Sequence, residues 1–239
     1  GLVTQRSYAI GLVVSNIADP FHSVVAQGVE EEALRQGYSL VLGTAGADPD
    51  REYDVVHSFQ SRHVDGIIVS SSRVGNRYAD LLQETGIPIV LINTHSDGDN
   101  MHAVYHDDYG GMAQIVRHLI DEGHRSIAHI SNERGGKARM EREQAWSDEM
   151  MQAGLATTLL FHGHNGRFEG GVAAATQLLS AVNGHGRAMP SAVCCYNDSM
   201  AAGVMRALRN YGFSLPEDVR ITGFDDVDFA AYLDPPLTT

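Results

Sequence analysis

Apolar stretches of strand length alternate with amphipathic stretches of helix length along the chain. The first apolar stretch, YAIGLVVS, is followed by ADPF, where Asp19 is a favourable N-cap and Pro20 suits the first helical position. Helical spacing of apolar residues then continues to Gly37. Asp48 and Pro49 repeat the same start signal. The pattern therefore predicts a strand followed by a helix, and then the same pair again.

The same alternation predicts nine strands and seven helices. The strands are expected at 8–15, 38–43, 66–71, 87–93, 103–108, 126–131, 157–163, 192–198 and 219–224. The helices are expected from 20, from 49 to about 64, at 78–84, 109–123 and 138–153, and from 169 and 198. Such alternation is typical of an α/β fold with parallel sheets and helices on both faces. A closed (β/α)₈ barrel, one large doubly wound sheet and two doubly wound lobes all satisfy it, with Gly123-His124 as the candidate boundary between lobes.

Polar segments follow almost every predicted strand. They read SNIADPF, SSSR, NTHS, HDDYG, SNERGG, HGHNGR, YNDS and FDDVD. Ligands of open parallel sheets lie beyond the carboxyl ends of the strands, so these segments are the candidates for a binding site. Serine, asparagine and aspartate are also ordinary turn and cap residues, which accounts for many of them individually but less readily for the whole set.

Charge and motifs narrow the function. The net charge of −13 makes the chain by itself a poor partner for nucleic acid. The adjacent Cys194 and Cys195 should point to opposite faces of a strand, which disfavours a mutual disulfide and favours a reducing, cytoplasmic compartment. Nucleophile elbow, P-loop and dinucleotide fingerprints are missing from the sequence. His162 and His164 lack further ligands at metal-binding spacing, so no metal or cofactor is expected.

The pair Asp225-Asp226 follows the last predicted strand. Neighbouring carboxylates diverge on an extended chain, so one should face a ligand and the other should cap the next element. A single carboxylate suits hydrogen bonds from ligand hydroxyl groups. Acid–base catalysis needs a second group with a separated pKa, and none can be assigned.

Four separated motifs resemble the LacI/GalR family of bacterial transcriptional regulators. They are RSYAIGLVVSNIADPFHSVVAQGVEEEALRQGYSLVLG, HLIDEGHRSIAHIS, REQAWSDEM and the segment from AVCCYNDS to DPPLTT, in the family's order. The resemblance implies two doubly wound parallel-sheet lobes of the type I periplasmic-binding-protein kind, with a ligand cleft between them. Residues 1–6 would end a linker, 7–122 form the N-terminal lobe and 123–239 the C-terminal lobe. Family members continue past PPLTT with strands that cross back to the first lobe.

The resemblance also implies a set of ligand-binding residues. Those that match family positions are Asp19, Phe21, Asp107, Arg142, Asn197 and Asp225, with Ser70, His164 and Phe168 as further candidates. Arginine and aspartate would grip ligand hydroxyl groups as donor and acceptor. One position departs from the family, because Gly166 stands where members often carry a stacking aromatic residue.

The function implied is that of the effector-binding, dimerising domain of a LacI-type regulator, which senses a sugar or nucleoside-like metabolite by lobe closure. The resemblance implies that it is not an enzyme, needs no cofactor or membrane, and contacts operator DNA only through an N-terminal helix-turn-helix head. The homodimer is expected to use the helix after Pro20, the helix at 78–84 and matching surface of the second lobe. The alternative is a periplasmic sugar-binding protein of an ABC transporter.

Overall fold

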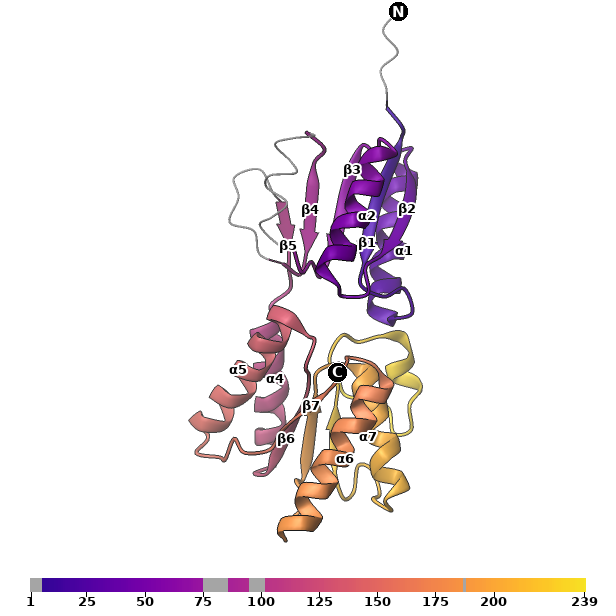
Figure 1. Cartoon of the computed structure of the whole chain (residues 1–239). Helices are drawn as coiled ribbons and strands as arrows, with labels where there is room; N and C mark the ends of the chain where they lie inside the picture. The colour runs from indigo at the N-terminus through magenta and orange to yellow at the C-terminus, as the bar shows by residue number, and fades with distance from the viewer. Residues whose placement is uncertain (1–5, 75–85, 95–101, 187) are drawn as a thin grey trace, which may run out of the picture. The chain divides into compact units, whose positions relative to one another are not determined.

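The computed structural model describes residues 6–74, 86–94, 102–186 and 188–239. The chain divides into two compact units, Gly1–His106 and Asp107–Thr239 (Figure 1). Both contain a parallel sheet with helices, so the predicted α/β class with two parallel sheets is confirmed.

The first unit is built on a five-stranded sheet in the order β2-β1-β3-β4-β5. Its strands are β1 (Ala9–Val14), β2 (Ser39–Thr44), β3 (Gly66–Ser70), β4 (Ile89–Ile92) and β5 (His102–Val104), and its described helices are α1 (Pro20–Arg35) and α2 (Pro49–Ser61). Asp19 caps α1 by accepting the Phe21 N–H at 3.1 Å, and Asp48 caps α2 by accepting the Asp50 N–H at 3.0 Å. Both predicted helix starts are therefore confirmed.

Glycines in the first sheet let α2 pack closely. A Cβ atom at Gly11 of β1 would overlap the ring of Phe59, and one at Gly43 of β2 would overlap Val55. Phe59 is almost completely buried in a core that includes Val56, Ile67 and other strand residues. The aromatic side chain fills the space that the missing glycine side chains leave.

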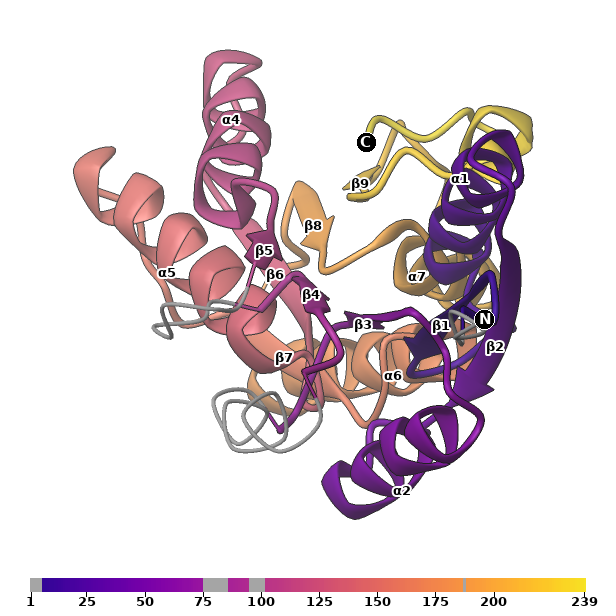
Figure 2. The same cartoon turned by 90° about the horizontal axis from the view of Figure 1, so that it is seen from above.

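The second unit is built on a four-stranded sheet in the order β7-β6-β8-β9. Its strands are β6 (Ile127–Asn132), β7 (Leu160–Gly163), β8 (Ala192–Cys195) and β9 (Arg220–Thr222); its helices are α4 (Asp108–Asp121), α5 (Gly136–Gln152), α6 (Phe168–His185), α7 (Asp198–Asn210) and the 3₁₀ turn η2 (Asp228–Tyr232). α4 and α5 form one helical layer and α6 and α7 another (Figure 2). Cys194 belongs to the α4–α5 core and Cys195 to the α6–α7 core, and both are free thiols, as expected of strand neighbours.

The boundary between the units lies earlier than the sequence pattern predicted. The pattern placed it at Gly123, whereas the structure places it between His106 and Asp107. α4 belongs to the second unit because its buried face, including Met112 and Leu119, packs in one core with Trp146 of α5. Periodicity identifies a helix but not the sheet that it covers. The predicted helix at 78–84 lies outside the described residues.

Both sheets have the doubly wound order in which the chain reverses direction of winding next to its first strand. This topological switch point lies between β1 and β3 in the first unit and between β6 and β8 in the second. Ligands of such sheets bind at the carboxyl ends of the strands beside the switch point. Those strand ends are therefore the candidate binding positions in each unit.

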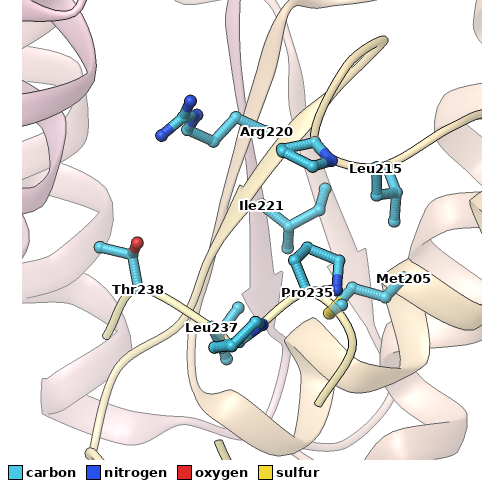
Figure 3. A pocket seen from close by; sticks show the side chains of 9 residues that line it. Met205, Leu215, Arg220, Ile221, Pro235, Leu237 and Thr238 are labelled. Carbon is cyan, nitrogen blue, oxygen red and sulfur yellow. The ribbon is translucent and has the colours of Figure 1, made fainter. Parts of the chain in front are cut away.

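A small apolar pocket lies elsewhere in the second unit. Its lining includes Met205 of α7, Leu215, Ile221 of β9, and Leu237 in the tail that pairs with β9 through Thr222 and Thr238 (Figure 3). Its volume of about 80 Å³ is small beside the roughly 300–1,000 Å³ of small-molecule sites, so we do not assign a ligand to it. No helix in the described part of the chain is long and apolar enough to cross a membrane.

Candidate functional site

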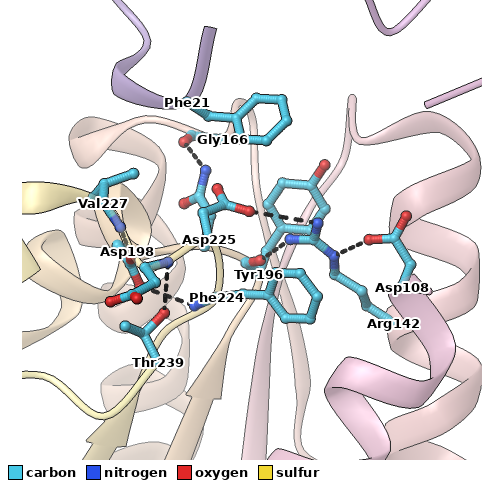
Figure 4. Close-up of polar contacts among 12 residues, drawn as sticks. Phe21, Asp108, Arg142, Gly166, Tyr196, Asp198, Phe224, Asp225, Val227 and Thr239 are labelled. Atoms are coloured by element: carbon cyan, nitrogen blue, oxygen red, sulfur yellow. Dashed lines mark hydrogen bonds and ion pairs between the residues drawn. The ribbon is translucent and has the colours of Figure 1, made fainter. Parts of the chain in front are cut away.

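A buried arginine contacts polar groups at the carboxyl ends of the strands in the second unit. Arg142 of α5 is only 3% exposed. Its Nε atom donates to Asp108 Oδ1 at 2.7 Å, one terminal nitrogen donates to the backbone carbonyl of Tyr196, and the other lies 3.6 Å from Asp225 Oδ1 (Figure 4). A buried charge is stable only when it is paired and hydrogen-bonded, and Arg142 meets both conditions.

Two aromatic rings enclose the same guanidinium group. Its central carbon lies 3.6 Å from the ring centroid of Phe224 and 4.6 Å from that of Tyr196. Both distances are within the range of cation–π attraction, which is stronger where water is excluded. Residues that follow β8 and β9 therefore hold the Arg142 side chain in one orientation.

The loop after β9 carries Asp225 in an unusual backbone conformation. Asp225 has φ = 104° and Asp226 has φ = 50°, and positive φ values at non-glycine residues cost about 1–3 kcal/mol each. Asp198, fully buried at the start of α7, accepts the backbone N–H groups of Phe224 and Val227, each at 2.9 Å. Burial raises the pKa of the Asp198 carboxyl. The loop is thus held in a strained shape by hydrogen bonds from both of its ends.

This geometry corrects one prediction about the aspartate pair. Asp225 does turn inward to Arg142, but Asp226 is exposed and does not cap the following turn, whose N-cap is Val227 without a side-chain bond. The prediction assumed an extended chain. Left-handed φ values at both aspartates change the directions of the two side chains.

Asn197 connects two loops of the second unit. Its Oδ1 atom accepts the Met200 N–H at 2.9 Å and caps α7, while its Nδ2 atom donates to the Gly166 carbonyl at 2.9 Å. A Cβ atom at Gly166 would lie 2.8 Å from Asn132 Nδ2. A large aromatic side chain at position 166 would therefore require the Asn132 side chain to move. His164 and Phe168 flank the glycine and are both exposed.

Of the two aspartates at the start of α4, the one not predicted is buried against the arginine. Asp107 is exposed and caps α4 by accepting the Gly110 N–H at 2.7 Å. Asp108, the first residue of the helix, is 5% exposed and forms the ion pair with Arg142. The sequence signal that could have identified Asp108 is an acidic residue immediately after an N-cap aspartate, next to a strand end.

A second polar network lies beside Arg142. Glu143 Oε1 accepts from Ser131 Oγ at 2.6 Å and from His162 Nε2 at 2.9 Å. Burial alone would raise the pKa of Glu143, but the hydrogen bonds from Ser131 and His162, together with the charges of Arg139 and His162, outweigh burial and lower that pKa. His162 thus has a carboxylate partner. Among the described residues, no group of three or more His, Cys, Asp or Glu side chains is placed to hold a metal ion.

The first unit has an uncharged network at its own switch point. His22 of α1 is buried, with Nε2 lying 2.7 Å from Ser15 Oγ after β1 and Nδ1 lying 3.4 Å from Ser70 Oγ at the end of β3. Burial lowers the pKa of His22 against the opposing effect of Asp19. The imidazole is therefore neutral near pH 7 and bridges the two strand ends. Sequence reasoning selected Ser70 but missed His22.

The other two predicted residues of the first unit, Asp19 and Phe21, lie at the start of α1. Phe21 is part of the first turn of α1, and its ring stacks on the imidazole of His106 with centroids 6.1 Å apart and planes 16° apart. Asp19 precedes it as the α1 cap. Asp19 and Phe21 thus lie in the segment that follows β1.

Comparisons with known proteins agree with this architecture. Residues 116–239 match the family model described as "Periplasmic binding protein-like domain". The transcriptional repressor PurR of Vibrio campbellii is 31% identical over 240 residues, which cover 100% of this chain and 70% of that protein. The periplasmic binding protein/LacI transcriptional regulator of Alkaliphilus metalliredigens, complexed with D-xylulofuranose, superposes with a TM-score of 0.85 at 31% identity, covering 97% of this chain and 83% of that one. A LacI family regulator from Lactobacillus casei with bound glucose gives 0.84 at 27% identity, covering 97% and 86%.

The fold and the polar strand ends define a periplasmic-binding-protein-like domain. The chain belongs to the LacI/GalR family of bacterial transcriptional regulators, and it carries that family's effector-binding domain. The predictions of a regulator rather than an enzyme, and of a regulator rather than a transporter component, are confirmed.

Proposed function

We propose that this domain binds a small polar effector, a sugar or nucleoside-like metabolite, chiefly through Arg142 and Asp225. The observation that carries the proposal is the buried guanidinium group held between carboxylates at the switch point of the second sheet. Charge-assisted hydrogen bonds contribute about 1.5–3 kcal/mol each, so a few of them suffice for micromolar binding. Two similar structures contain D-xylulofuranose and glucose, which supports a carbohydrate.

The proposed binding set keeps the residues selected from sequence. Asn197 follows Tyr196, whose carbonyl accepts from Arg142. Asp19 and Asp107 use one carboxylate oxygen as a helix cap and retain further acceptor positions. Phe21 would offer an aromatic face. Ser70, His164 and Phe168 are additional candidates at strand ends.

The test is calorimetry of the domain with D-glucose, D-galactose, D-ribose, D-xylulose and adenosine. We expect micromolar binding of at least one compound and its loss in Arg142→Ala. Arg206→Ala, which removes an exposed cation from α7, is the matched control and should bind as the wild type does. Wild-type affinity in Arg142→Ala would contradict the site assignment.

We propose that the protein acts as a homodimer and that α1 contributes to the interface. Val24 and Leu34 on α1 are 56% and 61% exposed, and the space around Gly28 is open. A two-fold interface of such helices is isologous and should bury at least about 1,000 Å² in total. Sedimentation of Val24→Glu should show a lower dimer fraction than wild type, whereas Glu30→Gln on the exposed part of α1 should not.

We propose that operator DNA is bound through a helix-turn-helix head that precedes this domain, in the cytoplasm. The PurR relative is of the helix-turn-helix type, and the net charge of −13 opposes phosphate contact by this domain. Effector binding by lobe closure would then shift the population of DNA-binding states. Tight, sequence-specific DNA binding by this domain alone in a gel shift would overturn this division of roles.

A further inference from the structure

Two side-chain amides meet beside Gly166 in the second unit. Asn132 is the last residue of β6, Gly166 follows β7, and Asn197 follows β8. A Cβ atom at Gly166 would lie 2.8 Å from Asn132 Nδ2 and 3.5 Å from Asn197 Nδ2. β6 and β8 flank the switch point of this sheet. Both amides therefore lie at the strand ends where doubly wound sheets bind their ligands.

The direction of the Asn132 amide follows from its own hydrogen bond. Its Oδ1 atom accepts the backbone N–H of Arg134 at 3.0 Å, and its backbone carbonyl accepts the N–H of Gly135 at 2.8 Å. A backbone N–H can only donate, so the end of the amide that faces Arg134 must be the oxygen. The NH₂ group is then the end beside Gly166, and the turn after β6 presents a hydrogen-bond donor there.

Hydrogen bonds connect this position with the arginine site. Asn197 Nδ2 donates to the Gly166 carbonyl at 2.9 Å, and Tyr196, which precedes Asn197, accepts from Arg142 through its own carbonyl. Asn132 is 7% exposed, and a buried amide requires acceptors for its N–H groups. A hydroxyl oxygen of a ligand has the lone pairs to accept such a bond. Because Gly166 has no side chain, it does not compete for this space.

We infer that Asn132 is a further ligand-binding residue, whose Nδ2 atom donates a hydrogen bond to a hydroxyl oxygen of the effector beside Gly166. The contact adds a neutral donor from β6 to the charged groups of Arg142 and Asp225. The inference rests on the proposed function, because it names one contact of the same effector.

The test is calorimetry with the tightest-binding compound among D-glucose, D-galactose, D-ribose, D-xylulose and adenosine, and with each of its monodeoxy derivatives. Asn132→Ser removes the Nδ2 donor and keeps a side-chain oxygen that can accept the Arg134 N–H. We expect it to weaken binding of the parent compound about three- to tenfold, the effect of one neutral hydrogen bond. One monodeoxy derivative, which lacks the contacted hydroxyl group, should bind the wild type and Asn132→Ser equally well.

Asn132→Asp replaces the NH₂ group by an oxygen atom and should weaken the parent compound more than Asn132→Ser does, because an acceptor then faces the hydroxyl oxygen. Its matched control is Asn210→Asp, which introduces the same charge at the exposed last residue of α7 and should bind as the wild type does.

Wild-type affinity for the parent compound in both Asn132 variants overturns the inference but leaves the proposed function standing. A loss of the same size for the parent and for every monodeoxy derivative assigns Asn132 a structural role and also overturns it. If none of the five compounds binds the wild type, the proposed function fails and the inference fails with it. A crystal structure of the wild-type complex decides the point even if the variants do not fold, since it should place a ligand hydroxyl oxygen about 3 Å from Asn132 Nδ2. A complex without that contact overturns the inference.

Discussion

Both units carry a polar network at the carboxyl ends of the strands near the switch point of their parallel sheet. The network of the first unit is neutral, whereas that of the second unit is charged. In the first unit, a neutral histidine joins Ser15 and Ser70, and no formal charge is buried among these three side chains. In the second unit, Arg142 is buried with two carboxylates between two rings. Neutral hydrogen bonds can be exchanged for water at modest cost, whereas a buried ion cluster is disrupted by the loss of any one member. We therefore expect substitutions in the charged network to lower the free energy of unfolding several times more than substitutions in the neutral network.

The largest effect should come from Arg142→Ala. It leaves Asp108 and Asp225 buried without their cation, which should lower the free energy of unfolding by about 3–5 kcal/mol. Urea denaturation followed by circular dichroism measures this loss. The double variant Arg142→Met with Asp108→Leu should recover part of it, because one of the two uncompensated carboxylates is then absent. A loss below 1 kcal/mol in Arg142→Ala would show that the charged network of the second unit is no more sensitive to substitution than the neutral network of the first.

Asp225→Ala should cost about 2–4 kcal/mol of effector binding, because a charge-assisted acceptor is lost and Arg142 loses one partner. Asn197→Ala should cost about 1 kcal/mol, since a neutral amide makes weaker bonds. Calorimetry with the compound identified for the wild type measures both. Equal losses of binding free energy in the two variants would contradict the prediction that the charged residues dominate effector binding.

A pH titration compares buried histidines in the two units. Burial lowers the pKa of His129 on β6 to about 4 and also lowers that of His22. A histidine with a depressed folded pKa stays neutral in the native state while the unfolded chain binds a proton. Stability is therefore complete above about pH 6.5 and falls as the pH drops, by up to about 3 kcal/mol for His129 by pH 4.

Thermal unfolding from pH 7 to pH 4 measures this dependence. His129→Gln should flatten the profile more than His22→Gln, because the latter lies in the smaller, partly solvated network. A wild-type profile that does not fall between pH 6.5 and pH 4 would show that neither histidine is held neutral.

The smallest effects should come from the serines of the first unit. Ser15→Ala removes a contact of 2.7 Å to His22 and should cost about 1 kcal/mol, whereas Ser70→Ala removes one of 3.4 Å and should cost less. Denaturation midpoints of the two variants test the order. A loss from Ser15→Ala as large as that from Arg142→Ala would show that the two networks are equally critical.

Helix starts and the class of the sheets could be predicted from the sequence, because they depend on residues close together in the chain. The Asp19-Pro20 and Asp48-Pro49 pairs marked helix starts that the structure confirms, because capping depends only on residues within one turn. The alternation of strand-length and helix-length apolar segments predicted parallel sheets, which the structure confirms. Arg142, Asn197 and Asp225 were selected from the family motifs, and the structure brings Arg142 and Asp225 into an ion pair.

Tertiary structure alone decided that Asp108 rather than Asp107 faces inward, and that the cation which Asp225 meets is Arg142. In the pair at the start of α4, Asp108 is buried and Asp107 caps the helix; after β9, Asp225 faces Arg142 while Asp226 is exposed. The choice depends on the positive φ values that Asp198 stabilises and on the assignment of α4 to the second sheet. Both depend on contacts between residues far apart in sequence. Periodicity and capping report only on near neighbours, so they determine where elements begin and cannot determine which charges meet.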